Sequence, residues 1–242
     1  MSVPDEQSFA RECQVERTPL QLKRWADEQL KQIGSTQVGK SAIRLRRGIA
    51  KQFIEEVYPL GLWASRVYGD RQDIRCKPVL GNQSYDAVIT DCATTPHREF
   101  RIEITQAMEG YDDHLRMEYM ERHGGVSMIG KPQRSGTRAD RKIDVPFEAA
   151  GHGTLIGRAE EQVRSALANK AVKAYAPNTS LLVMMEDAYY EWDGDFSDLD
   201  ALLLDWAKSG QSQFDAVYVL GWHGKVAVAA SVANGTWTIR RL

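Results

Sequence analysis

Apolar residues recur at helical spacing in the first quarter of the chain and predict two helices there. Thr18, Pro19 and Gln21 mark the start of the first helix, because they supply a capping hydroxyl, a proline in the first turn and an amide three residues after the cap. The second helix follows Ser41 and is expected to end before Pro59, since a proline lacks the N–H that a helix needs.

Two segments in the middle of the chain alternate between apolar and polar residues with a period of two, which is typical of strands. They cover residues 85–90 and 100–105, and the turn-forming residues between them predict a β-hairpin. Residues 108–153 have no clear period and are interpreted as an insertion. Further helices are expected at 156–175 and from Asp195 or Ser197 to Gly210, and further strands at 180–185, 214–220 and 226–232. This order predicts a single α/β domain over residues 1–242, with residues 1–40 as a helical extension.

Composition narrows the class of protein. The chain has 242 residues, of which 43% are hydrophobic, and this suits one large core. No window approaches the roughly 18 apolar residues of a membrane span, so no membrane partner is expected. Three cysteines lie far apart and suggest neither a zinc site nor a disulfide framework. The expectation is a cytoplasmic protein with reduced thiols.

The charge pattern bears on nucleic-acid binding. A formal net charge of −2 argues against a protein that coats nucleic acid by bulk electrostatics. Two basic clusters are candidates for local attraction of a polyanion, and the alternative is that each is only a solvated surface. The first cluster comprises Lys40, Arg44, Arg46, Arg47 and Lys51, and the second comprises Lys131, Arg134, Arg138, Arg141 and Lys142.

Asp86 and Glu103 are acidic residues with apolar neighbours in the two predicted hairpin strands. A tight hairpin would bring their carboxylates together, and two anions about 4 Å apart repel by roughly 4 kcal/mol at an effective dielectric near 20. Mg²⁺ or Mn²⁺ removes this penalty and prefers carboxylate oxygens as ligands. The pair is therefore a candidate metal site, and the alternative is that both carboxylates contact only solvent or Arg101.

Lys170 lies on the apolar stripe of the predicted helix at 156–175. Residues placed 100° apart put it on the same face as Val163 and Leu167, which are expected to pack on the sheet. One interpretation is that its stem runs along the core edge to water. The other is that its ammonium points over the sheet at the carboxylates, with Lys173 as the substitute candidate.

The order of these motifs resembles the PD-(D/E)XK nuclease superfamily, which has the restriction-endonuclease-like fold. The resemblance runs from about residue 41 to 222 and rests on short motifs taken in order: 85–89, 101–105, the lysine-bearing helix and the apolar segment 180–185. The segment 53–60 is similar to the first core helix of that superfamily. The implied architecture is a central mixed sheet flanked by helices.

The resemblance also implies a chemistry. Asp86 and Glu103 would bind Mg²⁺ or Mn²⁺, with the Ile104 carbonyl as a further ligand and Glu56 as an outer partner. The superfamily's lysine, two residues after the glutamate, is replaced here by Thr105, with Gln106 next to it. Lys170 is the candidate replacement, and Thr105 and Gln106 remain candidate catalytic residues.

The implied reaction is metal-assisted hydrolysis of a phosphodiester in DNA or RNA. The basic run that contains Lys131, Arg134, Arg138, Arg141 and Lys142 would contact the nucleic acid. The insertion is expected either to recognise the substrate or to mediate a homodimer.

Two other functions stay open at the level of sequence. The threonine at position 105 favours a nuclease-like binding or regulatory module without catalysis. Residues 34–41 match the phosphate-binding loop pattern of nucleotide-binding proteins. Such a loop needs a buried strand before it, whereas an amphipathic helix is predicted here, so this segment is expected to join two helices.

Overall fold

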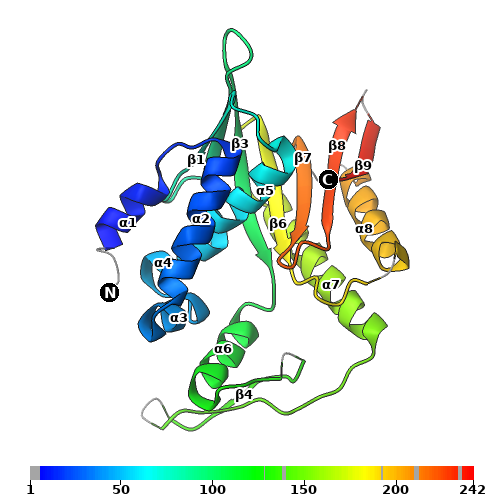
Figure 1. Cartoon of the computed structure of the whole chain (residues 1–242). Coiled ribbons are helices and arrows are strands. Elements are labelled where there is room, and N and C mark those ends of the chain that lie inside the picture. Colours follow the sequence, from blue (N-terminus) through cyan, green and yellow to red (C-terminus); the bar gives the residue numbers. More distant parts are fainter. Residues whose placement is uncertain (1–5, 128, 138–139, 192, 210–212, 234–235) are drawn as a thin grey trace.

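The computed structural model describes residues 6–127, 129–137, 140–191, 193–209, 213–233 and 236–242. Its centre is a seven-stranded mixed sheet with the order β1-β2-β3-β6-β7-β8-β9 and helices on both faces (Figure 1). The strands are β1 (Ile74–Pro78), β2 (Ala87–Asp91), β3 (Arg98–Ala107), β6 (Thr179–Met185), β7 (Ala216–Gly221), β8 (Ala227–Ala233) and β9 (Thr236–Arg241). The predicted α/β class and the mixed sheet are confirmed.

The predicted hairpin is present and has an additional strand beside it. β2 pairs antiparallel with β3, with Ala87 opposite Ile102, and β1 pairs antiparallel with the other edge of β2. Strand β1 was not predicted from the sequence, and Asp86 lies one residue before β2 rather than inside a strand. Because β2 begins at Ala87, the part of β3 beyond Glu103 has no neighbour strand on that side.

Two crossover connections make the middle of the sheet parallel. Helix α7 (His152–Ala171) leads from the insertion to β6, which lies parallel to β3, and α8 (Ser197–Lys208) leads to β7, which lies parallel to β6. The predicted start of α8 at Ser197 is confirmed. The predicted bounds of the helix at 156–175 were wrong at both ends. Helix α7 begins four residues earlier, at His152, and ends four residues earlier, at Ala171.

Alternate residues of the central strands enter two different cores. Ile102, Ile104 and Leu182 pack under the N-terminal helices, whereas Leu181 and Val183 pack under α7 and α8. This period of two places Glu103, which lies between Ile102 and Ile104, on the face that α7 covers. The sequence pattern predicted that Glu103 points to the opposite face of the sheet from Ile102 and Ile104, and this is confirmed.

The N-terminal helices form one layer on the other face of the sheet (Figure 1). They are α1 (Glu6–Cys13), α2 (Pro19–Gly34), α3 (Gln37–Arg44), α4 (Gly48–Gln52), the π-helical turn η1 (Phe53–Val57) and α5 (Tyr58–Tyr68). The start of α2 is as predicted, with the Thr18 N–H donating to Gln21 Oε1 at 3.0 Å. Helix α1 and strand β9 were not predicted from the sequence.

The prediction that a helix runs from Ser41 and ends before Pro59 was wrong. The helix is interrupted after Arg44, and Arg46 takes a positive φ of 49°. The backbone is then helical from Gly48 to Tyr68. Pro59 is tolerated because it lies in the first turn of α5, directly after the π-helical turn.

Gln106 compensates for the missing N–H of Pro59. In an α-helix the Glu55 carbonyl would accept a hydrogen bond from residue 59, which here has no N–H. The side-chain amide of Gln106 on β3 donates to that carbonyl instead, at 2.7 Å. The contact explains a polar side chain at the helix–sheet interface without invoking catalysis.

The variant Gln106→Leu is expected to lower the free energy of unfolding by about 1–3 kcal/mol, because it leaves the Glu55 carbonyl without this donor. Urea denaturation followed by circular dichroism measures the change. In a Pro59→Ala background residue 59 regains its N–H, so the same Gln106→Leu change should cost less. Equal losses in the two backgrounds would contradict the compensation.

Residues 108–153 are more ordered than their sequence suggested. They contain α6 (Tyr111–His123) and a small hairpin of β4 (Gln133–Ser135) and β5 (Lys142–Asp144). Together they lie beyond the carboxyl end of β3 (Figure 1). Leu115, Ile143 and Val145 form a small core of their own, which explains why no long hydrophobic period marks the segment.

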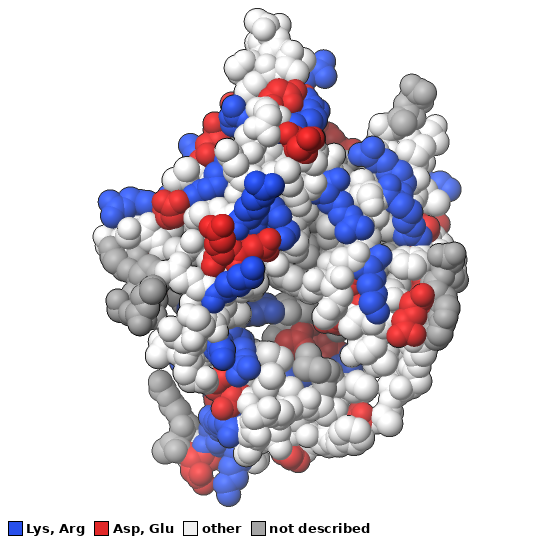
Figure 2. All heavy atoms as spheres, in the orientation of Figure 1, with Lys and Arg blue, Asp and Glu red and all other residues white. Residues whose placement is uncertain are grey.

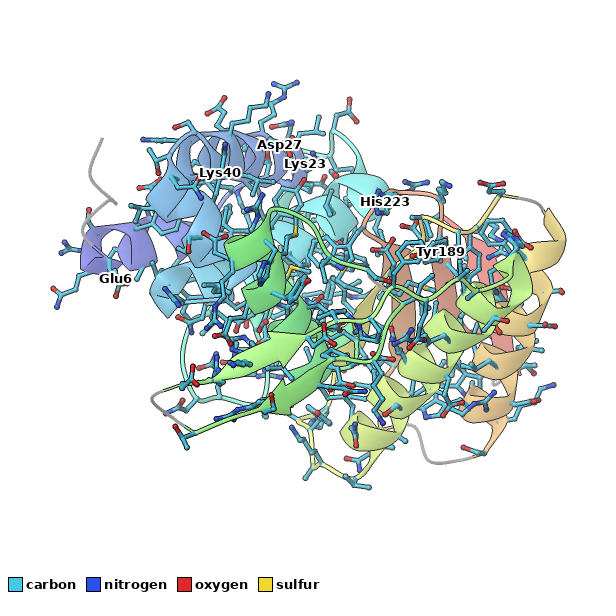
Figure 3. The ribbon with its side chains drawn as sticks, turned by 90° about the horizontal axis from the view of Figure 1, so that it is seen from below. Glu6, Lys23, Asp27, Lys40, Tyr189 and His223 are labelled. Carbon is cyan, nitrogen blue, oxygen red and sulfur yellow. The ribbon has the colours of Figure 1, made fainter. Side chains whose placement is uncertain are left out.

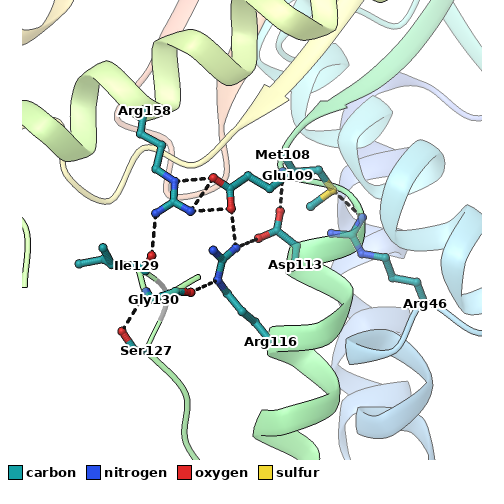
Figure 4. Close-up of polar contacts among 9 residues, drawn as sticks. All are labelled: Arg46, Met108, Glu109, Asp113, Arg116, Ser127, Ile129, Gly130 and Arg158. Carbon is teal, nitrogen blue, oxygen red and sulfur yellow. Dashed lines mark hydrogen bonds and ion pairs between the residues drawn. The ribbon is translucent and has the colours of Figure 1, made fainter. Parts of the chain in front are cut away.

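Charged side chains hold this insertion against α7. Glu109 accepts two hydrogen bonds from Arg158 at 2.5 Å each and pairs with Arg116 at 2.8 Å (Figure 4). Arg158 also donates to the Ile129 carbonyl, and Arg116 also pairs with Asp113. We call the contacts among Glu109, Asp113, Arg116 and Arg158 the clasp.

Among the described residues, no helix combines the length and the apolarity that a bilayer span requires.

Candidate metal centre

Asp86 is fixed beside the middle of β3 by two backbone contacts. Its own N–H donates to the Ile102 carbonyl at 2.8 Å, and its Oδ2 accepts from the Ile104 N–H at 2.7 Å. Asp86 therefore lies beside Glu103, because its two contacts are with the residues on either side of Glu103 on the neighbouring strand. This is the juxtaposition that the hairpin pattern predicted, reached from the residue before β2 instead of from within it.

Glu103 and Lys170 meet on the face covered by α7. The Lys170 ammonium donates to Glu103 Oε1, and the two side chains are only 14% and 10% exposed. Lys170 belongs to the last turn of α7, one turn after Leu167 in the core. The predicted direction of this lysine is confirmed, whereas its role in catalysis stays a proposal. Lys173 lies beyond the helix and is exposed.

Two carboxyl groups at this site, those of Asp86 and Glu56, resist ionisation. Burial, followed by the charge of Glu103, raises the pKa of Asp86 to about 6, although the Ile104 N–H and Lys170 oppose the shift. Burial, followed by the charges of Asp86 and Glu55, raises the pKa of Glu56 to about 7. The carboxylates of Asp86, Glu103 and Glu56 thus influence one another near the start of β2. A divalent cation relieves this repulsion between like charges.

The donor set fits a hard divalent cation. Asp86 and Glu103 each use one oxygen in the contacts above, and carboxylate oxygens are the ligands that Mg²⁺ and Mn²⁺ prefer. The N–H and C=O of a strand residue point to the same edge, so the Ile104 carbonyl faces the edge where Asp86 lies. Glu56 comes from η1 on the opposite layer and influences Asp86 and Glu103 by its charge, but the ligand oxygens of the three carboxylates do not all lie within 4.8 Å of one another.

Tyr175 is a neighbour of the site that the sequence analysis missed. It follows α7, packs on Phe214 with ring centroids 4.6 Å apart, and has a buried hydroxyl without a well-formed hydrogen bond to the described residues. Burial and the nearby Glu103 raise the pKa of this phenol. No charge or spacing in the sequence distinguishes this tyrosine from a core residue.

Thr105 and Gln106 have different surroundings. Thr105 is half-buried on β3, on the same face as Glu103 and two residues after it. Gln106 points to the other layer and binds the Glu55 carbonyl. This contact gives Gln106 a structural reason, and its catalytic role stays a prediction.

The basic residues of the insertion have mixed surroundings. Arg134 donates to the Tyr111 hydroxyl at 3.1 Å, and Arg141 pairs with Glu118. Lys131 and Lys142 are exposed, and Arg138 lies outside the described residues. On the face shown in Figure 2, acidic and basic side chains alternate around a hollow between the main body and the insertion. Contact of these residues with nucleic acid stays a prediction.

Three of the five residues of the first basic cluster pair with carboxylates. Arg44 pairs with Glu121 at 3.3 Å, and Arg46 and Lys51 pair with Glu55 at 2.7 and 3.9 Å. Lys40 and Arg47 are exposed.

The segment 34–41 joins two helices, as predicted. Gly34 ends α2, Thr36 caps α3 by accepting from the Gly39 N–H at 3.0 Å, and Lys40 lies within α3. Lys40 extends from the helical layer, well apart from Tyr189 and His223 (Figure 3). No strand feeds this segment, so the geometry of a phosphate-binding loop is missing from it.

A second acidic cluster lies at the carboxyl ends of β6 and β7. Glu186, Asp187 and His223 bring their ligand atoms within 4.8 Å of one another. Asp187 is fully buried, and its carboxylate accepts from the N–H groups of His223, Lys225 and Val226 at 2.7–2.8 Å. These bonds give Asp187 a structural role in shaping the β7–β8 turn, which explains the cluster without a metal.

Comparison with known proteins adds no assignment. The chain matches no family model, no curated protein and no solved structure.

Proposed function

We propose that this protein is a metal-dependent phosphodiester hydrolase that acts on nucleic acid, with a restriction-endonuclease-like core. The observation that carries the proposal is the meeting of Lys170 with Glu103, opposite Asp86, in a largely buried site. The topology supports it, because an antiparallel β1-β2-β3 unit is followed by a helical crossover to the parallel strand β6. Buried acidic groups with raised pKa values beside an ammonium are typical of functional sites.

Asp86 and Glu103 would hold Mg²⁺ or Mn²⁺, with the Ile104 carbonyl as a further oxygen donor and Glu56 as an outer partner. The bound cation would supply a Lewis acid that stabilises charge on the phosphoryl oxygens and lowers the pKa of a bound water. The two strands fix the carboxylates rigidly, so little reorganisation is needed when the substrate binds.

Lys170 would orient the water that attacks phosphorus. An ammonium has three N–H donors, and Glu103 uses one of them in this structure. The remaining donors can reach a water or a non-bridging phosphate oxygen. Lys170 would thus take the task of the lysine that Thr105 replaces.

A groove beside the site provides an approach for the substrate. It has a volume of about 450 Å³ and is lined by Arg46, Lys51, Glu55 and Gln106, among others. Arg46 and Lys51 both pair with Glu55 there, so two cations face one carboxylate in this part of the lining, and the residue after Glu55 is the site residue Glu56. A phosphate backbone that follows this groove would approach the carboxylates near the start of β2.

Wild-type protein with Mn²⁺ is expected to cleave at least one of three substrates: single-stranded DNA, duplex DNA or RNA. Asp86→Asn and Glu103→Gln should each lower the rate by about 100-fold or more, because each removes a charged metal ligand. Gel electrophoresis of end-labelled substrates measures the rate. Asp91→Asn, at the far end of β2, serves as a matched control that should cleave normally.

The threonine at position 105 favours a second candidate, a nucleic-acid-binding module in which the Lys170–Glu103 pair only neutralises the site. Binding of nucleic acid without cleavage in any metal would support that candidate. The absence of both binding and cleavage would contradict the two candidates together.

A further inference from the structure

Arg101 lies on β3 two residues before Glu103, and its side chain leaves the same face of the sheet. Successive strand residues alternate between faces, and Phe100 and Ile102 on either side of Arg101 both pack under the N-terminal helices. Two residues span only about 7 Å along a strand, which is within the reach of an arginine side chain. The guanidinium of Arg101 therefore belongs to the surroundings of the candidate metal centre.

Two contacts fix this guanidinium at the edge of the site. Its Nη1 donates to the Pro177 carbonyl at 3.2 Å, and its central carbon lies 5.4 Å from the centre of the Tyr85 ring. Tyr85 directly precedes Asp86, and Pro177 lies in the segment that follows α7. A guanidinium held by a ring and a carbonyl loses little further freedom when it binds a ligand.

An acidic partner for Arg101 is missing among the described residues, since no carboxylate oxygen there lies within 4.0 Å of its nitrogens. Glu103 pairs with Lys170 instead, and the Asp86 carboxylate accepts from the Ile104 N–H. The contact between Arg101 and these carboxylates, which the sequence left open, is therefore not made. A fixed cation beside the site is left to meet an anion from outside the chain.

Most of the donors of Arg101 are open to a ligand. A guanidinium has five N–H donors, and the Pro177 carbonyl takes one of them. Nε and Nη2 have no hydrogen-bond partner among the described residues, and neither of these two atoms is buried. The edge formed by Nε and Nη2 is a fork that can bind two oxygens of one phosphate. Arg101 is thus accessible as well as unpaired.

We propose that Arg101 binds a phosphate of the nucleic-acid strand, next to the phosphate that lies at the metal centre. A strand that follows β3 would meet the cation held by Asp86 and Glu103 first and the guanidinium of Arg101 one nucleotide away. The fork geometry suits a phosphodiester, which offers two non-bridging oxygens. The place of this phosphate beside the cleaved bond rests on the proposed function, whereas the contact itself does not need catalysis.

Fluorescence anisotropy of the full chain in EDTA tests the contact without cleavage. The probes are labelled single-stranded DNA, duplex DNA and RNA of equal length, each titrated at several salt concentrations. The wild type is expected to bind at least one probe, and the probe bound most tightly identifies the source of the phosphate. Arg101→Ala should raise Kd by about tenfold and lower the slope of log Kd against log salt by about one, because one phosphate contact is lost.

Three further variants separate the charge of Arg101 from its structural contacts. Arg101→Gln keeps an amide that can donate to the Pro177 carbonyl but has no charge, so it should bind as weakly as Arg101→Ala. Arg101→Lys should restore the salt slope but only part of the affinity, because an ammonium lacks the fork. Arg98→Ala, exposed at the start of β3, should bind like the wild type. Wild-type affinity in Arg101→Gln, an unchanged salt slope in Arg101→Ala, or no binding of any probe by the wild type would overturn the proposal.

The test separates this contact from the nuclease. In EDTA, Asp86→Asn should bind the chosen probe at least as tightly as the wild type, because it removes a negative charge and no phosphate contact. A wild type whose binding depends on Arg101 but that cleaves nothing would refute the nuclease and leave the phosphate contact standing. Cleavage together with an Arg101→Ala variant of wild-type affinity and salt slope would refute the contact alone.

Discussion

Lys170→Ala is expected to abolish Mn²⁺-dependent cleavage, with a loss of at least about 100-fold in rate, because it removes the group that orients the attacking water. The fold should persist, since Lys170 lies in the last turn of α7 and the helix is held by Val163 and Leu167. Rates on end-labelled substrate and a far-ultraviolet circular dichroism spectrum check both statements.

Lys173→Ala is the matched control for this variant. It removes the same type of side chain three residues further on, at an exposed position beyond the helix. Its cleavage rate should stay within about threefold of the wild type, as expected for a distant screened charge. Equal rates for Lys170→Ala and the wild type would show that the Lys170–Glu103 pair is structural.

The second large effect concerns pH and metal together. The pKa of Asp86 rises from 3.8 to about 6 on folding, and that of Glu56 rises from 4.5 to about 7. The folded state therefore holds these protons more tightly than the unfolded state does, and without metal the stability contributed below pH 4 is lost as pH rises through 6 and 7. For Asp86 alone the loss is on the order of 3 kcal/mol before solvent screening is discounted.

Thermal unfolding between pH 5 and pH 8 measures this effect. Without metal, Tm should fall as pH rises, and Mn²⁺ should restore it at pH 8 but hardly at pH 5, because only the ionised carboxylates bind the cation. Asp86→Asn should flatten the pH dependence and remove most of the response to Mn²⁺. A wild-type Tm that ignores Mn²⁺ at pH 8 would argue against a metal centre.

Local patterns predicted most of the central sheet. Strands β2, β3 and β6 carry alternating or continuous apolar residues, and such patterns depend only on which faces are buried. The helical layer was harder, because the effect of Pro59 depends on a π-helical turn and on an amide from β3. The donation from Gln106 joins residues far apart in the chain, and no local period reports it.

Some residues of the candidate site were also predictable from local patterns, and others were not. Glu103 and Lys170 follow from the direction of alternate strand residues and from the 100° step of a helix, and their contact was predictable. Asp86 was assigned to the right neighbourhood but to the wrong backbone setting. The place of Tyr175 beside Glu103 depends on how separate segments converge, and residue types alone carry no sign of that convergence.

The clasp has a consequence for how this protein can diversify. Glu109 lies near the start of the insertion and Arg158 lies in α7 after its end. The two side chains bind each other directly, so the two ends of the segment between them lie close together. The cost of closing a loop changes slowly with its length, and residues within such a loop can be added or removed without disturbing the strands. Residues 110–151, between Glu109 and the start of α7, are thus the segment in which insertions and deletions are expected to disturb the central sheet least.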